Sequence, residues 1–305
     1  HCVTEPIKNS GGYFKGKAGK VAGNILAVLY TWYFIHLASL VLRDFGEFIC
    51  TVTFPETPMA VVIGLFALIM VYAINSGIEV IGRLSELLVP VIALIASIIS
   101  LSFITVYDLT AFLPILENGI KPVLNTAFNF ITFPFGETVA FLMLFPHVNK
   151  KEKLKKVVLV SAVVSTFLGI ILFFRDIFVL GSDLLARSSF IPHLTSLLIP
   201  GLNVEPLIDI NLLIGGGVKI SVCIYAAAKA LSQIAGINDY RTLTGAISTF
   251  CVVLSIWEYE NVLEMFNWTE KVWPYYSILF QIVVPLLLLL FSIKKGKPSN
   301  AGAQN

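Results

Sequence analysis

A short segment with the residue types of a binding site interrupts an apolar run that extends from about residue 124 to residue 146. It consists of Thr132, Phe133, Pro134, Phe135, Gly136 and Glu137. Pro134 has no backbone N–H and Gly136 favours unwinding, so a helix long enough to cross a bilayer should break here. The carbonyl groups freed by a break, and the positive end of the helix that follows, can bind polar groups. The alternative interpretation is a proline kink with a packed, neutral Glu137.

A second candidate is Lys219, which follows the three glycines from Gly215 to Gly217 inside another long apolar run. Glycine in a helix costs about 1 kcal/mol relative to alanine, so three in a row indicate close backbone approach or local unwinding beside a cavity. Three interpretations of Lys219 remain open. It is a buried counter-ion, with Glu137 as the candidate partner, a direct ligand or proton-coupling group, or a lysine that snorkels to the membrane surface.

Other ionisable residues in apolar runs favour structural roles. Two pairs of neighbouring charges lie near the ends of runs, where long side chains can snorkel and form ion pairs. These pairs are Arg43 with Asp44 and Arg175 with Asp176. His36 and His147 are isolated in the sequence and are interpreted as packing or interface residues. The sequence shows no paired carboxylates or histidine cluster suited to catalysis or to a metal, and four scattered cysteines lack a C-x-x-C spacing, so neither an enzyme nor a cofactor is expected.

Composition indicates the elements that must position these residues. Of 305 residues, 57% are hydrophobic and 13% are charged, against about 45–50% and 25% in soluble domains. The fold class is therefore predicted to be all-α and integral to the lipid bilayer, and a net charge of +2 gives no indication of nucleic-acid binding. Apolar runs of about 18 residues or more predict eight spans. They cover residues 18–49, 59–76, 84–107, 122–147, 157–180, 205–237, 242–260 and 273–294.

Lysine clusters predict the orientation of these spans. With eight spans, the clusters before the first, after the fourth and after the eighth fall on one side, which is then cytoplasmic. Residues 181–204 and 260–270 carry apolar residues at helical spacing and are expected to form surface helices, the first capped by Ser182 and Asp183. The chain opens with His1 rather than Met, so its true beginning is expected to lie upstream.

Six short motifs occur in a definite order along nearly the whole chain. They are Tyr30-Thr31-Trp32-Tyr33, Leu42-Arg43-Asp44-Phe45-Gly46-Glu47-Phe48, Pro55-Glu56-Thr57-Pro58, Gly82-Arg83-Leu84-Ser85-Glu86, Phe133-Pro134-Phe135-Gly136-Glu137 and Pro206-Leu207-Ile208-Asp209. In these residues and this order the sequence resembles the B subunit of bacterial spore germinant receptors. That family belongs to the amino acid–polyamine–organocation transporter superfamily.

The resemblance implies an inverted-repeat (LeuT-like) transporter fold of ten helices, with helices 1 and 6 broken at the substrate site. The eight predicted spans would be helices 3 to 10 of a single polytopic domain over residues 1–305, and the broken segment would be helix 6. Helices 1 and 2 would be absent from this sequence, although helix 1 supplies half of the site in the superfamily. The sequence would then be a truncated reading of a longer gene or a degenerate copy.

The resemblance also implies a function. The chain would sense a small germinant, typically an amino acid, in the inner membrane of the spore and would signal to companion A and C subunits. Carbonyl groups from Thr132 to Phe135 would accept hydrogen bonds from an ammonium group, and Phe133 and Phe135 would shape an apolar pocket. The opposite walls would consist of Tyr30 and Tyr33 from helix 3 and Gly216 and Lys219 from helix 8. An amino-acid transporter of the same superfamily is the alternative function.

Overall fold

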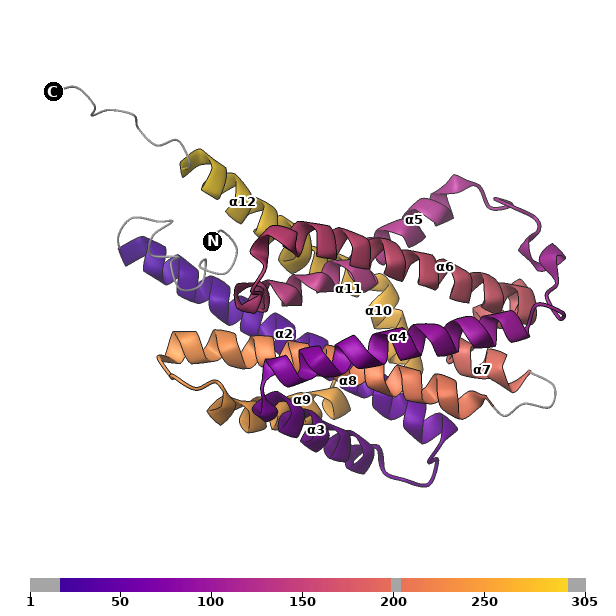
Figure 1. Cartoon of the computed structure of the whole chain (residues 1–305), viewed down its shortest axis with the longest axis horizontal. Coiled ribbons are helices and arrows are strands. Elements are labelled where there is room, and N and C mark those ends of the chain that lie inside the picture. Colours follow the sequence, from indigo (N-terminus) through magenta and orange to yellow (C-terminus); the bar gives the residue numbers. More distant parts are fainter. Residues whose placement is uncertain (1–16, 199–203, 296–305) are drawn as a thin grey trace. The chain divides into compact units, whose positions relative to one another are not determined.

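The computed structural model describes residues 17–198 and 204–295, and these residues fold almost entirely into helices (Figure 1). Six helices in this part of the chain are long and apolar enough to cross a membrane. They are Val21–Val52 within α2 (Lys17–Val52), α3 (Met59–Ser76), α4 (Ile78–Ser102), Lys151–Arg187 containing α6 (Leu154–Arg187), α8 (Glu205–Ala235), and Trp273–Leu290, which joins α11, η6 and part of α12. The chain is thus an all-helical protein of the membrane type that its composition predicts.

Shorter elements connect or complete these helices. In chain order they are η1 (Leu109–Phe112), α5 (Ile120–Phe130), η2 (Ile131–Phe135), η3 (Gly136–Met143), η4 (Phe145–His147), η5 (Lys151–Lys153), α7 (Ile191–Leu197), α9 (Arg241–Trp257), α10 (Val262–Lys271), α11 (Trp273–Ile278), η6 (Leu279–Val283) and α12 (Val284–Lys295). Two of them, η2 and η6, are π-helical. Single π-helical turns often mark functional positions in helices.

Two of the eight predicted spans are not continuous helices of spanning length. The fourth, residues 122–147, is divided into α5, η2, η3 and η4, which confirms the expected break. The seventh forms α9 and bends by 101° into α10, with Asn261 capping the new helix by accepting a hydrogen bond from the Glu264 backbone N–H. The surface helix expected at 260–270 is confirmed as α10.

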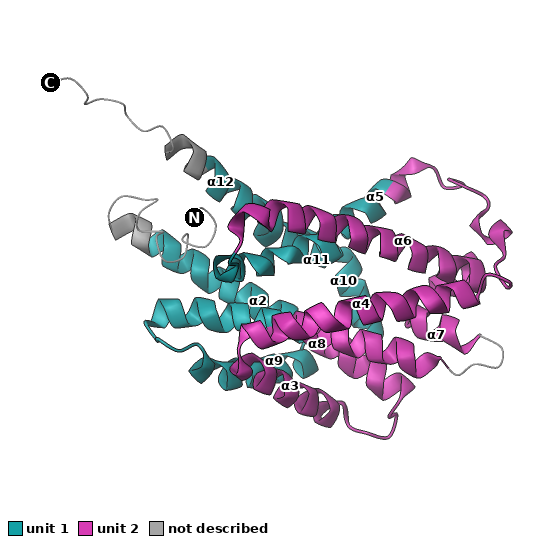
Figure 2. Ribbon diagram, viewed as in Figure 1, with its two compact units in different colours: residues 1–39, 124–149, 222–305 teal, residues 40–123, 150–221 magenta. Residues whose placement is uncertain are grey.

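The chain divides into two compact units, and unit 1 contains residues 1–39, 124–149 and 222–305 (Figure 2). It therefore holds the first part of α2, the broken segment, and the helices from the second half of α8 to α12. Aromatic side chains dominate its core, where Tyr33, Tyr225 and Trp273 are almost completely buried. The second half of α8 packs closely through small residues, since the four alanines at positions 226–228 and 230 are fully buried.

Unit 2 contains residues 40–123 and 150–221, and so includes α3, α4, α6, α7 and the first half of α8. The helices α3 and α8 approach each other closely at Gly217, where an added Cβ would lie 3.2–3.3 Å from Met70 and Phe66 of α3. Gly215 and Gly216 are open, with no atom within 4 Å of an added Cβ. The helix α8 continues through all three glycines, so the alternative of local unwinding at this place is wrong.

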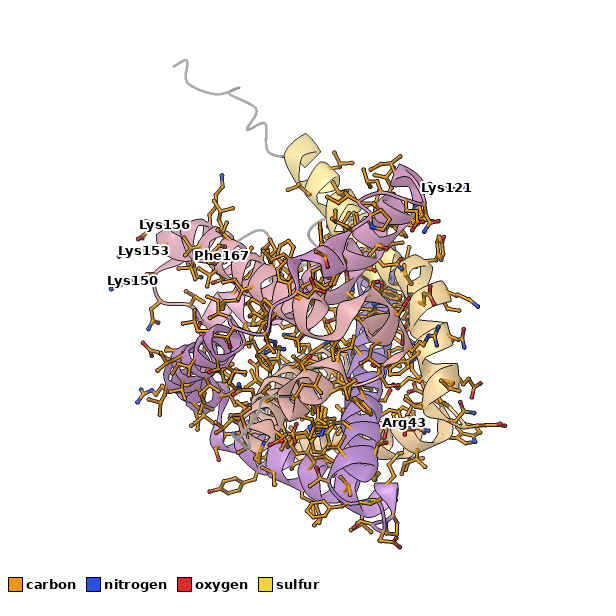
Figure 3. All side chains as sticks on the ribbon, turned by 90° about the vertical axis from the view of Figure 1, so that its right-hand side faces the viewer. Arg43, Lys121, Lys150, Lys153, Lys156 and Phe167 are labelled. Atoms are coloured by element: carbon orange, nitrogen blue, oxygen red, sulfur yellow. The ribbon has the colours of Figure 1, made fainter. Side chains whose placement is uncertain are left out.

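The helix α6 is longer than the predicted span 157–180 and bends at Gly181, where φ is 74° and ψ is 164°. A second helical segment follows this glycine up to Arg187, and α7 begins at Ile191. Helical structure is therefore confirmed in the described part of the predicted surface segment 181–204. Residues 199–203 of that segment lie outside the described residues. Three of the lysines that orient the predicted topology, Lys150, Lys153 and Lys156, gather at the start of α6 (Figure 3). The side of the membrane on which they lie stays a prediction.

Candidate ligand site at the broken helix

The break in the fourth predicted span is centred on Phe133 and Pro134. Phe133 has extended backbone angles, φ −139° and ψ 116°, between two helical segments, and the peptide bond that follows it is cis. Pro134 has no N–H for the carbonyl group one turn earlier, so the helical ladder is interrupted as the sequence predicts. The second segment begins near Gly136 and is a tight 3-10 helix rather than an α-helix.

The side chain of Gln281 is hydrogen-bonded to the broken segment. Its Nε2 donates one hydrogen bond of 2.9 Å to the Thr132 carbonyl oxygen and another of 2.8 Å to Tyr33 Oη. A Cβ added at Gly136 would overlap the Gln281 amide and would lie 2.9 Å from the Ile131 carbonyl oxygen. One buried amide therefore joins η2, η6 and α2, and Gly136 is required for its close approach.

Aromatic rings surround this amide on the side of α2. Tyr33 is stacked on Phe280 with ring centroids 4.8 Å apart and on Trp273 at 6.0 Å. Tyr30, one helical turn earlier, donates a hydrogen bond of 2.7 Å to the Phe280 carbonyl oxygen inside η6. A π-helical turn leaves carbonyl groups without their usual partner, and this bond supplies a donor to one of them.

The structure brings several of the predicted site residues together. Thr132, Gly136 and Tyr33 meet at Gln281, and Thr132 and Tyr33 are fully buried. Glu137 is also buried, with 8% of its surface exposed. The other three residues of the segment, Phe133, Pro134 and Phe135, are exposed in this chain, so the expected apolar pocket between the two phenylalanines is not formed by the described residues alone.

Gly216 and Lys219 belong to unit 2, whereas the broken segment belongs to unit 1. Their membership of the site therefore stays a prediction. Within unit 2, Lys219 lies within electrostatic range of Asp44 on α2.

The predicted ion pairs differ from expectation at one position. Arg175 does bind Asp176, with 2.6 Å between Arg175 Nη2 and Asp176 Oδ1. Arg43 binds Glu47, with 2.8 Å between Arg43 Nη2 and Glu47 Oε1, and residues four apart share a helix face. Both arginines are almost completely buried, with 3–4% of their surface exposed, so the expectation that they snorkel is wrong.

The two histidines interpreted as isolated have polar partners. His36 Nε2 lies 3.1 Å from Glu258 Oε1, and Ser39 on the same helix face donates to that carboxylate. His147 Nε2 lies 3.1 Å from Tyr225 Oη. These contacts place both histidines at helix interfaces, as predicted, but the sequence did not indicate their partners. Among the residues that the structure describes, no three His, Cys, Asp or Glu side chains gather as metal ligands would.

Gln281 is the residue that sequence reasoning missed. It is a lone amide in the apolar run 273–294, and polar side chains inside a span usually bond to a neighbouring helix. This signal was available in the sequence. Its partners were not, because they lie 149 and 248 residues away along the chain.

These features define a helical integral membrane protein with an interrupted helix held by a buried amide. The sequence profile of a family described as spore germination protein matches residues 4–262. The chain belongs to this family of spore germination proteins.

Curated relatives agree with this assignment. The chain is similar to spore germination protein KB of Bacillus subtilis, with 33% identity over 297 residues, 93% of this chain and 79% of that protein. It is also similar to the putative spore germination protein YfkT of the same species, with 23% identity over 277 residues, 88% of this chain and 75% of that protein. Spore germination protein YndE matches at 27% over 156 residues, 51% of this chain and 43% of that protein. No solved structure matches the chain.

Proposed function

We propose that this protein is the germinant-sensing membrane subunit of a spore germinant receptor. It binds a small molecule such as an amino acid at the broken segment 132–137 and signals to companion A and C subunits in the inner membrane of the spore. Membership of the spore germination protein family supports a role in spore germination. The role is one of binding and signalling, without catalysis, and the inverted-repeat arrangement of a transporter is part of the proposal.

The observation that carries the proposal is the hydrogen-bonded contact of Gln281 with Thr132 and Tyr33 at the break. An ammonium group needs acceptors, and the backbone from Thr132 to Phe135, which leaves the regular helical path at Phe133, supplies carbonyl groups. A ligand that hydrogen-bonds to the Thr132 carbonyl oxygen competes with the Gln281 amide for that acceptor. The ligand thereby favours a conformer in which the hydrogen bond between Gln281 in η6 and Thr132 in η2 is broken.

Signalling follows from this competition. A ligand shifts a conformational equilibrium only by the difference between its affinities for the two states. Because Gln281 bonds to α2 and to η2 at once, a change at the break alters the contact between three helical elements of unit 1. Companion subunits in contact with any of these elements would detect the change.

Binding to the purified full-length protein in lipid nanodiscs tests the proposal. Scintillation proximity with a panel of radiolabelled amino acids should reveal one or a few that bind. The substitution Gln281→Leu should change the affinity for the bound amino acid by about tenfold or more, the factor that corresponds to 1.4 kcal/mol. Gln233→Leu is the matched control, because Gln233 is an amide on another helix of unit 1, remote from the break in sequence. Equal effects of the two substitutions would contradict a site at the break.

An amino-acid transporter of the same superfamily is the second candidate. The observation that favours it is the break itself, since interrupted helices at mid-membrane depth also form substrate sites in transporters. Uptake of the bound amino acid into proteoliposomes separates the two functions. A receptor subunit binds without net uptake, whereas a transporter accumulates the amino acid and loses uptake when Gly136 is replaced.

A further inference from the structure

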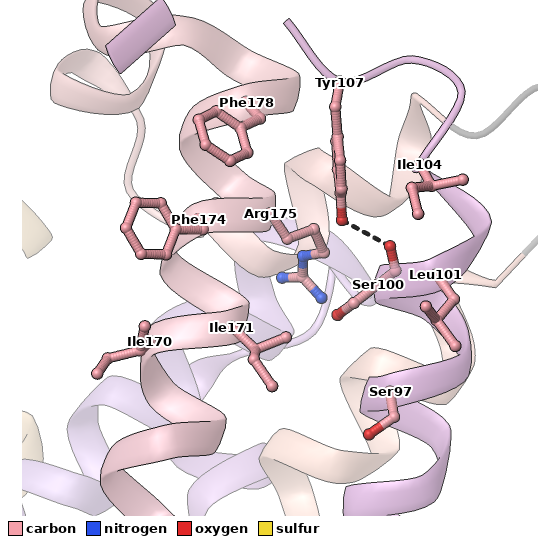
Figure 4. A pocket seen from close by; sticks show the side chains of 10 residues that line it. All are labelled: Ser97, Ser100, Leu101, Ile104, Tyr107, Ile170, Ile171, Phe174, Arg175 and Phe178. Atoms are coloured by element: carbon pink, nitrogen blue, oxygen red, sulfur yellow. Dashed lines mark hydrogen bonds between the residues drawn. The ribbon is translucent and has the colours of Figure 1, made fainter. Parts of the chain in front are cut away.

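A groove with a volume of about 550 Å³ lies between α4 and α6 within unit 2, away from the broken segment in the sequence (Figure 4). Its walls are almost entirely apolar. Leu101 and Ile104 contribute from the α4 side, and Ile171 and Phe174 contribute from α6. A surface of this kind accepts a hydrocarbon ligand.

One charged side chain interrupts the apolar wall. Arg175 lines the groove and is only 3% exposed, and Figure 4 shows its guanidinium between α6 and the residues Ser100 and Tyr107. Its Nε and Nη2 donate to Asp176 Oδ1 at 2.8 and 2.6 Å. A guanidinium has five N–H donors, so these two bonds leave donors for an anion. Asp176 itself accepts from Thr195 and is not among the lining residues, so the groove is lined by the cation and not by its counter-ion.

The remaining polar groups of the groove are engaged inside the protein. Ser97 and Ser100 each donate a hydrogen bond of 2.7 Å to the backbone carbonyl one turn earlier in α4. Tyr107 donates to the Ser100 carbonyl oxygen at 2.6 Å. Burial raises the pKa of the Tyr107 phenol, with Arg175 opposing this effect, so the phenol remains a neutral donor. Arg175 is therefore the lining residue whose donors can recognise a ligand, and it selects an anionic group.

The position of Arg175 along α6 places this charge near the end of a span. It lies six residues before the bend at Gly181, which is about 9 Å along the helix axis. On the opposite wall, Ser100 lies two residues before the end of α4 at Ser102. The charged part of the groove is thus close to the depth of lipid headgroups, and the part lined by Ile170 and Ile171 is further inside the membrane.

We propose that this groove is a binding site for one phospholipid, whose phosphate accepts hydrogen bonds from Arg175 and whose acyl chain lies against Leu101, Ile171 and Phe174. The N–H donors of Arg175 at one end of an apolar wall match the polar head and the apolar chain of this ligand. A transmembrane helix of a partner protein fits less well. A helix about 10 Å across would fill such a volume in roughly 7 Å of its length, little more than one turn.

Native mass spectrometry of the full-length protein, purified in detergent and delipidated, tests the proposal. Phosphatidylglycerol titrated onto the protein should be retained at one molecule per chain. Diacylglycerol with the same acyl chains lacks the phosphate and should bind about tenfold more weakly, the factor that 1.4 kcal/mol from the lost charge-assisted hydrogen bonds would give. Inorganic phosphate alone should not displace the lipid, because it makes no contact with the apolar wall.

Two substitutions on one helix localise the site. Ile171→Trp fills the groove and should lower lipid retention about tenfold, whereas Leu159→Trp on the exposed surface of α6 should leave it unchanged. This pair keeps the test valid even if Arg175→Gln fails to fold because Asp176 is left unpaired. Equal retention of diacylglycerol, displacement by phosphate, or equal loss in the two tryptophan variants would each overturn the proposal.

Discussion

The interruption at Phe133 in unit 1 lies inside a long apolar run, and the interruption at Gly181 in unit 2 lies at the end of one, and their surroundings differ. Beside the first, the Gln281 amide is so close to Gly136 that it leaves no room for a Cβ. Beside the second, an added Cβ at Gly181 would have no atom within 4 Å. The first interruption is hydrogen-bonded to another segment, and the second has no neighbour at its glycine.

This difference separates two uses of glycine. Gly136 has ordinary helical angles, φ −65° and ψ −27°, so its lack of a side chain serves contact with another segment. Gly181 has backbone angles that only glycine adopts readily, so its lack of a side chain serves the bend itself. A contact between two segments can change when a ligand binds, whereas a bend without neighbouring atoms only sets the direction of the chain. The proposed ligand response therefore concerns the first interruption.

Replacement of Gly136 by leucine should have the largest effect. The new side chain would overlap the Gln281 amide and the Ile131 carbonyl oxygen, and would separate η2 from η6. Spores that carry the full-length Gly136→Leu protein should fail to germinate on the cognate germinant, although the protein remains in the membrane. Gly64→Leu is the control, because the position is helical and open. A normal response of the Gly136 variant would remove the broken segment from the site.

Replacement of Gln281 by leucine should have the next largest effect. The change leaves the Thr132 carbonyl oxygen and the Tyr33 hydroxyl without the amide donor, and each buried unsatisfied group costs about 1–3 kcal/mol. The midpoint of thermal unfolding of the purified protein should fall, and the germinant concentration for half-maximal germination should change with it. An unchanged midpoint would show that the amide contributes nothing to the closed contact.

Replacement of Gly181 by alanine should lower stability without changing ligand affinity. Backbone angles of this kind cost a residue with a side chain about 1–3 kcal/mol. Gly169→Ala on the same helix is the matched comparison, since Gly169 is open and helical, and alanine there should be neutral or stabilise by up to about 1 kcal/mol. Thermal unfolding and ligand binding should both be measured. A change in ligand affinity caused by Gly181→Ala would contradict the distinction between the two interruptions.

Replacement of Tyr33 by phenylalanine should have the smallest effect. It removes one of the two acceptors of the Gln281 amide and keeps the ring that stacks on Phe280, so the expected loss is about 1 kcal/mol. In a double-mutant cycle with Gln281→Leu, the two losses should be less than additive, because both substitutions break the same hydrogen bond. Additive losses would mean that the contact between these side chains carries no energy.

Local chemistry made part of this structure predictable. Pro134 cannot donate a hydrogen bond wherever it lies, so the break beside it followed from the sequence. The pairing of Arg175 with Asp176 was also predicted from the sequence, but the burial of the pair was not. The pairing of Arg43 with Glu47 was missed, although the spacing of four residues that places them on one helix face is visible in the sequence.

The sequence by itself determined that the chain is helical and apolar enough to cross a membrane, and where one of its helices must break. These properties depend on the composition of each segment and on the covalent structure of proline and glycine. Only the tertiary structure decided that Gln281 meets Thr132 and Tyr33, and that Arg175 borders a groove. The physical reason is that all the apolar helices have similar hydropathy, so their partners are selected by the fit of side chains from distant parts of the chain.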